Sequence, residues 1–460
     1  MQSIPDKIHF IGIGGAGMSG LAQILVELGR EVTGSDLNRT PVTERLESLG
    51  AACYKGHHRE NVQSPDLIVV STAIPEDNPE LVAAREKGIP VIHRGDLLSL
   101  LMERQKGIAI CGAHGKTTTT SMLATVLEKN NLDPTIVIGG ELTEIGGNAK
   151  LGCGDYMVAE ADESDGSFLK LSPEVVVITN IEDDHLDYYG SISEIEASFK
   201  RFLDKVPSNG LAVVCVDDPN VCRAIAGYDK PVITYAVNSG DADYIAREIN
   251  LNGIGTIGEI YFRGDRLGQL KLTVPGKHNL ANALSAVAVG RHVGLPFTQI
   301  AEALRSFKGA GRRFQLLGEV GGVKVIDDYA HHPSEIEATV QAAKQVNPKR
   351  LIGVFQPHRY TRTSQLYDRF GRVFSGVDEI IINEIYSAGE RPIEGVNAGL
   401  IVRAIKKNSG KDARFFITRD EIVDYLAGCV QPGDMVLTMG AGNIWTVGVE
   451  LVERLKENRD

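Results

Sequence analysis

The sequence predicts an α/β protein with three α/β domains, and two features of the chain support this prediction. Short apolar segments typical of buried strands alternate with amphipathic segments typical of helices along most of the 460 residues, which favours parallel sheets covered by helices. Glycine-rich turns join a strand to a helix at two places. We expect a Rossmann-like N-terminal domain, a central P-loop domain and a Rossmann-like C-terminal domain.

The first predicted domain covers residues 1–105 and begins with a strand at 7–13, a helix at 18–28 and a second strand that ends at Asp36. The turn at residues 12–17 reads GIGGAG, which fits the pattern G-x-G-x-x-G between a strand and a helix. Backbone N–H groups of such a turn can bind a diphosphate, and the acidic residue after the second strand is typical of dinucleotide sites. The alternative is that these glycines only let the helix pack closely on the strand.

The second predicted domain covers residues 106–310 and carries the more specific motif. After an apolar strand, the loop at 112–117 reads GAHGKT and leads into a helix. Its small residues let backbone amides surround phosphate oxygens, the Lys116 ammonium adds a positive charge, and the Thr117 hydroxyl can reach Mg²⁺. The loop departs from the strict P-loop spacing because Ile110 stands in place of the first glycine. The alternative is a glycine turn followed by an exposed lysine and a helix-capping threonine.

Acidic and imidazole side chains follow the next two predicted strands of this domain. Residues 160–163 read EADE and residues 180–185 read NIEDDH, and ligands of open α/β sheets bind at such carboxyl ends of strands. Mg²⁺ prefers oxygen ligands, so Glu160 is a candidate ligand beside Thr117. Histidine is an unusual magnesium ligand, and His185 taken alone is interpreted as a structural residue at a strand end.

Residues 230–275 are less regular and alternate like antiparallel strands before an apolar helix at 278–290. Small residues at 309–311 then indicate a linker. The third predicted domain, residues 311–460, repeats the alternation of strands and helices. Its predicted strands lie at 324–326, 351–355, 379–382 and 435–438.

Two loops of the third domain combine histidine with charged residues directly after a strand. Residues 327–333 read DDYAHHP and residues 356–362 read QPHRYTR. Histidine and arginine at one sheet edge suit carboxylate or phosphate groups, because arginine can bind both with two parallel hydrogen bonds. For Arg359 and Arg362 taken singly, a solvated basic loop is an equally good interpretation.

The composition excludes several classes of protein. The chain has 48 lysine and arginine residues against 60 aspartate and glutamate residues, a formal charge of −12, so we expect no nucleic acid or membrane partner and only local phosphate binding. Six scattered cysteines without a C-x-x-C pair favour neither a zinc knuckle nor a disulfide framework. No signal-peptide pattern and no apolar run of about 18 residues is present. We therefore expect a cytoplasmic protein, either a monomer or a homodimer.

Taken together, these motifs resemble those of the Mur ligases of peptidoglycan synthesis. The resemblance covers essentially the whole chain in order and rests on GIGGAGMSG, GAHGKTTTT, EADESD, TNIEDDHLD, HNLANALSA, DDYAHHPSE and QPHRYTRT. The chain is most similar to the branch that joins L-alanine to UDP-N-acetylmuramate. Within the family, the alternative is the branch that recycles a cell-wall tripeptide onto the same UDP-sugar. Outside it, the alternatives are an NAD-dependent dehydrogenase, which would leave the P-loop without a function, and a non-catalytic nucleotide-regulated module.

The resemblance implies an ADP-forming carboxylate–amine ligase that activates the lactyl carboxylate of UDP-N-acetylmuramate as an acyl phosphate before L-alanine attacks. It implies ATP and Mg²⁺ as cofactors, with Mn²⁺ as a substitute. The first domain would bind the UDP-sugar. The second domain would be ATPase-like and would bind ATP and metal, and the third domain would bind the amino acid. The first glycine turn is thereby reassigned from a dinucleotide to the diphosphate of UDP.

The resemblance also implies a role for each motif residue. The UDP-sugar contacts would be Gly12, Gly14, Gly15, Ala16, Gly17, Asp36, Ser71, Thr72, Ala73, His93 and Arg94. The ATP contacts would be Gly112, Ala113, His114, Gly115, Lys116, Thr117, Thr118, Asn282, Arg313 and Asp328, with Arg312 as an alternative to Arg313. The metal ligands would be Thr117, Glu160 and His185, and the amino-acid contacts His358, Arg359 and Arg362. The catalytic residues would be Lys116, Arg359 and His331, the last assisting proton removal from the amine.

One position departs from the family pattern. Several Mur ligases carry a carbamylated lysine downstream of the motif histidine, where the carbamate can bridge to a second metal ion. Phe199 and Lys200 occupy that region here. The source of a second metal ligand, and any modification of Lys200, therefore stay open.

Overall fold

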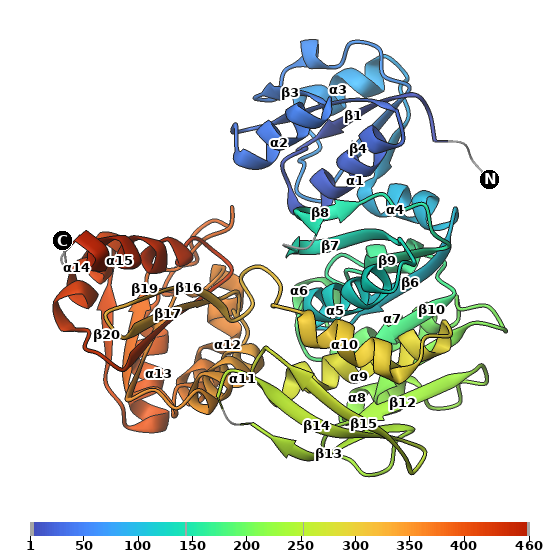
Figure 1. Ribbon diagram of the computed structural model, residues 1–460. Coiled ribbons are helices and arrows are strands. Elements are labelled where there is room, and N and C mark those ends of the chain that lie inside the picture. Colours follow the sequence, from blue (N-terminus) through green and yellow to red (C-terminus); the bar gives the residue numbers. More distant parts are fainter. Residues whose placement is uncertain (1–3, 143–144, 252, 458–460) are drawn as a thin grey trace. The chain divides into compact units, whose positions relative to one another are not determined.

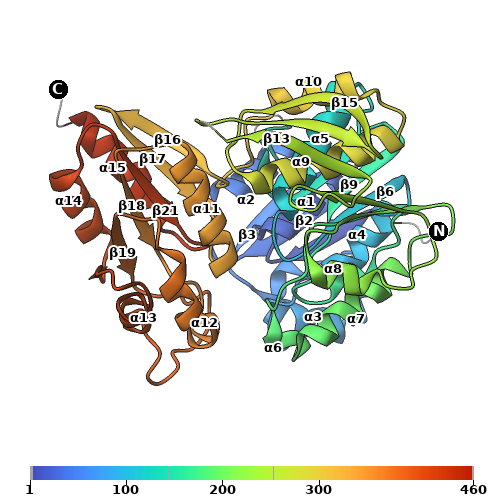
Figure 2. The same cartoon turned by 90° about the horizontal axis from the view of Figure 1, so that it is seen from below.

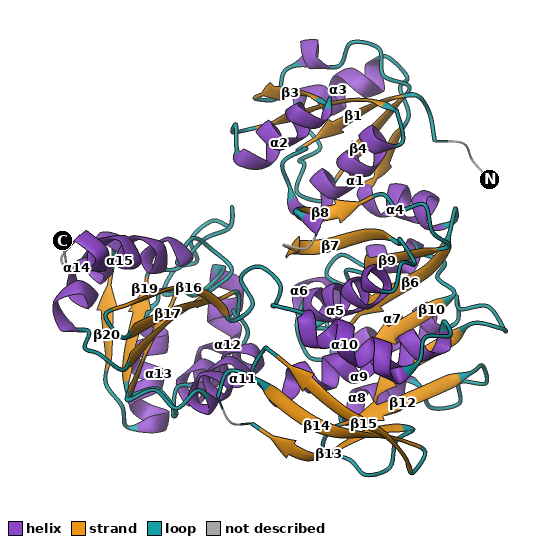
Figure 3. Cartoon of the chain, viewed as in Figure 1, coloured by secondary structure: helices purple, strands orange, loops and turns teal. Residues whose placement is uncertain are grey.

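The computed structural model describes residues 4–142, 145–251 and 253–457 (Figure 1). Helices and strands alternate along the described chain, and the strands form three parallel-rich sheets (Figure 3). This confirms the prediction of three α/β domains. The described chain divides into two compact units. Unit 1 contains residues up to 247, 259–270 and 281–307, and unit 2 contains 248–258, 271–280 and the residues from 308 onward. Unit 1 holds the first sheet and most of the second, and unit 2 holds the third.

The first sheet has five parallel strands, in the spatial order β3 (Ala52–Lys55), β2 (Glu31–Asp36), β1 (Lys7–Ile11), β4 (Leu67–Val70) and β5 (Val91–His93). Its helices are α1 (Ala16–Glu27), α2 (Pro41–Leu49), α3 (Pro79–Glu86) and α4 (Arg94–Met102). Ile8, Phe10 and Ile11 of the central strand β1 are buried. The strand order reverses between β1 and β4, and ligands of open α/β sheets bind at such a switch point. The glycine turn after β1 lies at this point.

The second sheet has ten strands. Their spatial order is β15 (Asp265–Leu272), β14 (Thr256–Phe262), β13 (Tyr244–Asn250), β12 (Val232–Ala236), β11 (Leu211–Cys215), β10 (Val175–Ile178), β6 (Lys106–Cys111), β9 (Tyr156–Glu160), β7 (Thr135–Leu142) and β8 (Gly147–Lys150). Its helices are α5 (Lys116–Lys129), α6 (Leu186–Tyr189), α7 (Ile192–Leu203), α8 (Pro219–Ala224), α9 (Lys277–His292) and α10 (Phe297–Ser306).

The phosphate-loop motif joins β6 to α5 in the middle of this second sheet. β6 pairs in parallel with both β9 and β10, and α5 packs against β6, β7 and β9 (Figures 1 and 2). The chain leaves β6 toward β7 on one side and later returns to β10 on the other. The loop therefore also lies at a switch point of the strand order, where a bound ligand is expected.

The antiparallel interpretation of residues 230–275 is wrong where the structure gives the direction of pairing. β12 and β13 pair in parallel, with Tyr235 opposite Tyr244 and Ala236 opposite Ile245. Alternation of apolar and polar residues reports which face of a strand is buried and carries no information about strand direction. The helix expected after this stretch is confirmed as α9.

The third sheet, in unit 2, has the spatial order β16 (Gln315–Val320), β17 (Val323–Asp328), β21 (Asp434–Met439), β18 (Arg350–Phe355), β19 (Glu379–Asn383) and β20 (Ala413–Phe416). β16 pairs antiparallel with β17, and the other neighbours pair in parallel. The helices are α11 (Pro333–Gln345), α12 (Tyr360–Val373), α13 (Gly399–Ser409), α14 (Arg419–Cys429) and α15 (Trp445–Glu457). The four strands predicted for this domain are confirmed as β17, β18, β19 and β21.

Alternate residues of these strands face two separate apolar cores. Ile326 and Phe355 belong to a core that includes residues of α11, α12 and α13, whereas Val325 and Val354 belong to one that includes residues of α14 and α15. Helices therefore cover both faces of the sheet, as the near-continuous apolar strands predict. The small-residue segment at 309–311 is irregular and connects α10 to β16. No helix in the described part of the chain is long and apolar enough to cross a membrane.

Candidate active site

The glycine turn between β1 and α1 is held by hydrogen bonds from its own backbone N–H groups. Gly12 has φ +82°, in the left-handed region that favours glycine, and its N–H donates to the Ser35 carbonyl at 2.8 Å. A Cβ atom on Gly14 would lie 2.9 Å from Asp36 Oδ2. That carboxylate accepts a hydrogen bond of 2.9 Å from the Gly14 N–H, so Asp36 contacts the turn itself. α1 begins at Ala16 without a cap from any described side chain, which suits binding of an anion at its N-terminus.

The loop after β4 lies beside this turn. Ile74 Cδ1 would be 3.2 Å from a Cβ atom on Gly12. The Ile74 N–H donates to the Ser71 carbonyl at 3.1 Å and closes a short turn through Thr72 and Ala73. The structure therefore brings this predicted UDP-sugar segment next to the glycine turn.

Arg94 and His93, at the start of α4, contact acidic residues of the second domain within unit 1. Arg94 Nη2 donates to Asp162 Oδ2 at 2.9 Å and to Asp165 Oδ2 at 3.4 Å. His93 Nε2 lies 3.7 Å from Asp165 Oδ2, and burial lowers the pKa of His93. A Cβ atom on Gly17 would lie 3.1 Å from Arg94 Nη1. Arg94 therefore connects the glycine turn of the first domain to the acids that follow β9.

Residues at the end of β10 hold the phosphate-loop motif in shape. Gly112 has φ +132°, and a Cβ atom there would lie only 2.1 Å from Thr179 Oγ1. The His114 N–H donates to Asn180 Oδ1 at 2.8 Å, and Asn180 Nδ2 donates to the His114 carbonyl at 2.9 Å. The predicted loop residues Gly112 and His114 are therefore fixed by the neighbouring strand.

Two other predicted ATP contacts lie next to this loop. Asn282 comes from α9, far along the chain, and its Oδ1 would be 2.8 Å from a Cβ atom on Gly115. Gly115 itself has φ +83°. Thr118 is buried in the first turn of α5. The structure thus brings Asn282 to the loop, although no regular sequence spacing connects them.

Lys116 is surrounded by oxygen atoms. Its Nζ donates to the Gly112 carbonyl at 2.6 Å, to the Ala113 carbonyl at 3.2 Å and to Glu163 Oε1 at 2.8 Å. Burial lowers the pKa of Lys116, but nearby carboxylates, Glu163 and Asp162 first among them, outweigh burial and raise it above its ordinary value. For Asp162 burial raises the pKa, and the charges of Lys116 and Arg94 outweigh it and lower the value to about 2. Lys116 is therefore cationic and surrounded by carboxylates.

Thr117 and Glu160 form a pair of oxygen donors at the start of α5. Thr117 Oγ1 lies 3.1 and 3.2 Å from the two carboxylate oxygens of Glu160, and the Gly139 N–H donates to Glu160 Oε2 at 2.8 Å. One hydroxyl and one carboxylate beside a phosphate loop fit Mg²⁺, which takes few protein ligands and completes its shell with phosphate and water. His185, the third predicted ligand, has φ +57°, and its described side-chain contact is Asp184 Oδ2 at 3.6 Å.

The two residues in the region where several Mur ligases carry the modified lysine differ in environment. Phe199 on α7 is buried and packs on Phe168, with ring centroids 5.3 Å apart. Lys200 is the next residue on the same helix and is exposed.

In unit 2, the two neighbouring arginines after the linker have different surroundings. Arg312 Nε donates to Asp327 Oδ2 at 2.9 Å, and its Nη2 donates to the Gly440 carbonyl at 2.7 Å. Arg312 thus ties the start of the domain to β17 and to the segment after β21. Arg313 lies over the ring of Tyr329, 5.1 Å from its centroid. Arg312 lies over the same ring, 5.0 Å from its centroid, and Arg313 Nη1 lies 3.6 Å from Glu335 Oε1. Both arginines are therefore held by contacts within the third domain.

Asp328 ends β17 and is almost fully buried. Its Oδ2 accepts from the Phe314 N–H at 2.7 Å and its Oδ1 accepts from the Ala330 N–H at 2.8 Å. Burial raises the pKa of Asp328 to about 6, although Arg313 and these two N–H groups oppose the rise. Asp328 therefore shapes the loop that carries His331.

The other three predicted residues of this unit gather with His331. The rings of His331 and His358 lie 5.8 Å apart, and His358 stacks on Tyr386 at 5.8 Å with an interplanar angle of 12°. Arg362 Nη1 lies 3.2 Å from His358 Nδ1. Arg359 has φ +69°, unusual for a residue other than glycine, and its N–H donates to the Tyr386 carbonyl at 2.8 Å. Two loops thus converge at the carboxyl end of the sheet.

Sequence reasoning gave no role to several residues of these clusters. Glu163 and Asp165 lie inside the EADESD motif, but only the structure shows that they contact Lys116, His93 and Arg94. Tyr386 was missed. It comes three residues after the end of β19, so its position at a strand end was the available signal.

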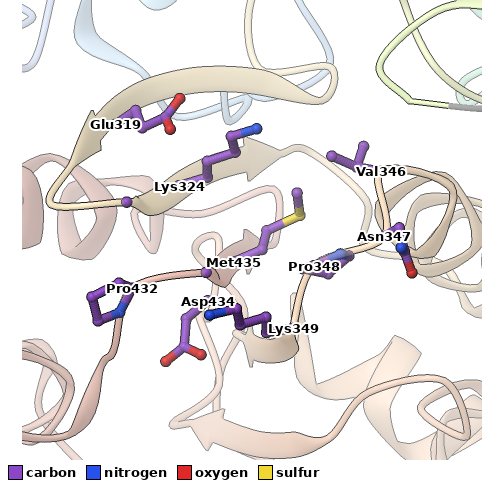
Figure 4. Close-up of a pocket in the computed structure, with 11 residues that line it drawn as sticks. Glu319, Lys324, Val346, Asn347, Pro348, Lys349, Pro432, Asp434 and Met435 are labelled. Carbon is purple, nitrogen blue, oxygen red and sulfur yellow. The ribbon is translucent and has the colours of Figure 1, made fainter.

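A pocket of about 410 Å³ lies elsewhere in unit 2 (Figure 4). Lys324, Lys349, Asp434 and Met435 are among the residues that line it. These residues stand at or just before the starts of β17, β18 and β21. The pocket is therefore at the amino ends of the strands, opposite the edge that carries Asp328 and His358.

Three family models match the chain in succession. The Mur ligase family, catalytic domain, matches residues 7–106, the Mur ligase middle domain matches 110–290, and the Mur ligase, glutamate ligase domain, matches 312–442.

Similar proteins agree with these matches. The UDP-N-acetylmuramate–L-alanine ligase of Pelotomaculum thermopropionicum is 64% identical over 452 residues and 98% of each chain. The ligase of the same name from Desulforamulus reducens is 54% identical over 460 residues and 99% of each chain. The solved UDP-N-acetylmuramate–alanine ligase of Thermotoga maritima is 32% identical with a TM-score of 0.85, covering 98% of this chain and 99% of that one. The chain belongs to the Mur ligase family.

Proposed function

We propose that the chain is an ATP-dependent ligase that joins L-alanine to the lactyl carboxylate of UDP-N-acetylmuramate, releasing ADP and phosphate, in peptidoglycan precursor synthesis. The observation that carries this proposal is the full-length similarity to ligases of that name, 64% identical in one case. We place the reaction in the cytoplasm and keep residues 1–105, 106–310 and 311–460 as its three functional domains.

The first domain is proposed to bind the UDP-sugar. The glycine turn, with the uncapped start of α1, would receive the diphosphate. The loop at residues 71–73 and the side chains of His93 and Arg94 would hold the remainder. Asp36 already contacts the Gly14 N–H, so in this arrangement it would shape the turn beside the ligand.

The second domain is proposed to bind ATP at residues 112–118, with Asn282 next to the loop. Thr117, Glu160 and His185 would hold Mg²⁺ or Mn²⁺, which would neutralise charge on the transferred phosphate. Arg313 and Asp328 are the proposed nucleotide contacts of the third domain. Lys116 would stabilise negative charge on the β- and γ-phosphates, because its pKa is raised and its ammonium therefore stays charged.

The reaction needs an activated carboxylate. A carboxylate is a poor acyl donor at neutral pH, and transfer of the γ-phosphoryl group of ATP to the lactyl carboxylate gives an acyl phosphate with a good leaving group. The amine of L-alanine then attacks the acyl carbon. The resulting tetrahedral oxyanion collapses to the amide as phosphate leaves, and nearby cations stabilise its charge. Before attack, the alanine ammonium must lose a proton.

His331 is proposed to assist this proton removal. Its Nδ1 lies 3.0 Å from the Tyr329 carbonyl oxygen, which can only accept a hydrogen bond. Nδ1 therefore carries the hydrogen in this contact, and Nε2 becomes the nitrogen that can accept a proton. Arg359 and Arg362 would bind the amino-acid carboxylate beside His358.

The rival within the family is a ligase for a cell-wall tripeptide. A solved murein peptide ligase from Psychrobacter arcticus is 26% identical with a TM-score of 0.73. Phosphate release from MgATP and UDP-N-acetylmuramate distinguishes the two when L-alanine, the tripeptide and no acceptor are compared. We expect release that depends on L-alanine. Preference for the tripeptide would favour the rival, and no release with any acceptor would contradict both.

A further inference from the structure

All three donors of the Lys116 ammonium are engaged in the structure. An ammonium group has three N–H donors and no acceptor. Those of Lys116 have acceptors in the Gly112 carbonyl, the Ala113 carbonyl and Glu163 Oε1, at 2.6, 3.2 and 2.8 Å. A phosphate oxygen can therefore bind this ammonium only by replacing one of them.

Glu163 is the acceptor that a phosphate should replace. The two carbonyls belong to the loop that carries Lys116, whereas Glu163 is an acidic side chain from the segment after β9. Burial raises the pKa of the Glu163 carboxyl, and the Lys116 ammonium opposes this rise because it favours the ionised form. A carboxylate and a phosphate near one ammonium repel each other, and the repulsion is strong because water is largely excluded. The two anions therefore compete for the same cation.

The surroundings of Glu163 make this competition unavoidable. The residue is 3% exposed, and its Oε2 is buried without a hydrogen-bond partner among the described residues. Its carbonyl accepts from the Tyr189 hydroxyl at 2.5 Å and from the Gly166 N–H at 3.0 Å, which fixes the backbone. Lys116 is thus the cation that compensates the Glu163 carboxylate, and Glu163 cannot turn into water when a phosphate arrives.

We propose that Glu163 is a positioning residue that holds Lys116 in the nucleotide-free protein and yields it to the nucleotide phosphate. The inference rests on the proposed role of this loop in ATP binding. Glu163 then keeps the lysine in place between turnovers and weakens nucleotide binding. Release of ADP is favoured because the ion pair with Lys116 re-forms.

The first test compares ADP affinity by isothermal titration calorimetry, with and without Mg²⁺, in the wild type, Glu163→Gln and Glu128→Gln. Glu128 lies on helix α5, which begins at Lys116, and its Oε1 pairs with Lys150 Nζ at 2.6 Å. This control therefore loses the same charge away from the loop. We expect Glu163→Gln to bind ADP about tenfold more tightly, the effect of about 1.4 kcal/mol of lost repulsion, and Glu128→Gln to match the wild type. A merely structural Glu163 would give weaker ADP binding in Glu163→Gln, and unchanged or weaker binding overturns the inference.

The second test measures how much the ion pair of Lys116 with Glu163 stabilises the nucleotide-free protein. Lys116→Ala should lower the melting temperature because it leaves a buried carboxylate uncompensated, and adding Glu163→Gln should restore part of the loss. If the two substitutions lower the melting temperature additively, Lys116 and Glu163 do not form an ion pair in the nucleotide-free protein. If the wild type binds no ADP, the proposed function fails. If it binds ADP but Glu163→Gln does not bind more tightly, only this inference fails.

Discussion

Replacing Glu80 by glutamine should destabilise the first domain at neutral pH. Glu80 lies in α3 and is fully buried. Its Oε2 accepts from the Ser35 hydroxyl at 2.5 Å and lies 3.5 Å from His9 Nε2, and Asn61 Nδ2 donates to its other oxygen. Glutamine has nearly the same shape but no charge, so it removes the charge-assisted part of these contacts.

The magnitude follows from the pKa of Glu80. Burial raises this pKa, but hydrogen bonds from His9, Ser35 and Asn61 outweigh burial and lower it from 4.5 to about 2. A depression of 4.5 − 2 = 2.5 pKa units corresponds to about 3 kcal/mol at 1.36 kcal/mol per unit. Because the folded pKa is the lower one, this stability is present above pH 4.5 and is lost as the pH falls toward 2.

Hydrogen exchange of the β1 and β2 amides measures the effect, because it reports the free energy of opening of this domain within the whole protein. Glu86→Gln is the control. Glu86 lies on the same helix, and its ion pair with Arg59 is exposed, so the opening free energy of Glu86→Gln should stay close to that of the wild type. Glu80→Gln should lose about 3 kcal/mol at pH 7 and approach the wild type as the pH is lowered. Equal stability of Glu80→Gln and wild type at pH 7 would show that the Glu80 charge does not stabilise the first domain.

Three further predictions concern the proposed site. Glu160→Gln should raise the Mg²⁺ concentration for half-maximal activity at least about tenfold, because a ligand charge worth about 1.4 kcal/mol is lost; an unchanged metal titration would exclude Glu160 as a ligand. Asp165→Asn should raise KM for UDP-N-acetylmuramate about tenfold, because it removes a charged hydrogen-bond partner that positions Arg94. KM for ATP should stay constant, and a parallel rise in both KM values would contradict this prediction. Gly112→Ala should destabilise the protein by more than about 1 kcal/mol, because φ is positive and Thr179 blocks the Cβ; denaturant unfolding tests this, and wild-type stability would show that the loop adapts.

Much of the fold could be predicted from the sequence because its signals are local. A strand, a glycine turn and a helix are contiguous in both glycine-rich motifs, and the structure has β1 and α1 at one and β6 and α5 at the other. The direction of β13 relative to β12 could not be predicted, because alternation of apolar residues is the same in parallel and antiparallel strands.

The contacts among the site residues depend on the tertiary fold. Thr117 follows the loop after β6, and Glu160 ends β9. Parallel pairing of β6 with β9 makes these two residues neighbours. Asn282 reaches Gly115 from α9, which no local pattern indicates. The ion pair between Lys116 and Glu163 likewise depends on the tertiary fold, because the fold shields both side chains from solvent. Residue type alone does not indicate that a charged side chain is buried.

The central claim, ligation through an acyl phosphate, is tested most directly by isotope transfer. UDP-N-acetylmuramate labelled with ¹⁸O in the lactyl carboxylate is incubated with the protein, MgATP and L-alanine, and the phosphate and the amide product are analysed by mass spectrometry. We expect each phosphate released to carry one ¹⁸O atom from the carboxylate and the product to gain the mass of one alanine residue. Amide product formed together with unlabelled phosphate would contradict the acyl-phosphate route.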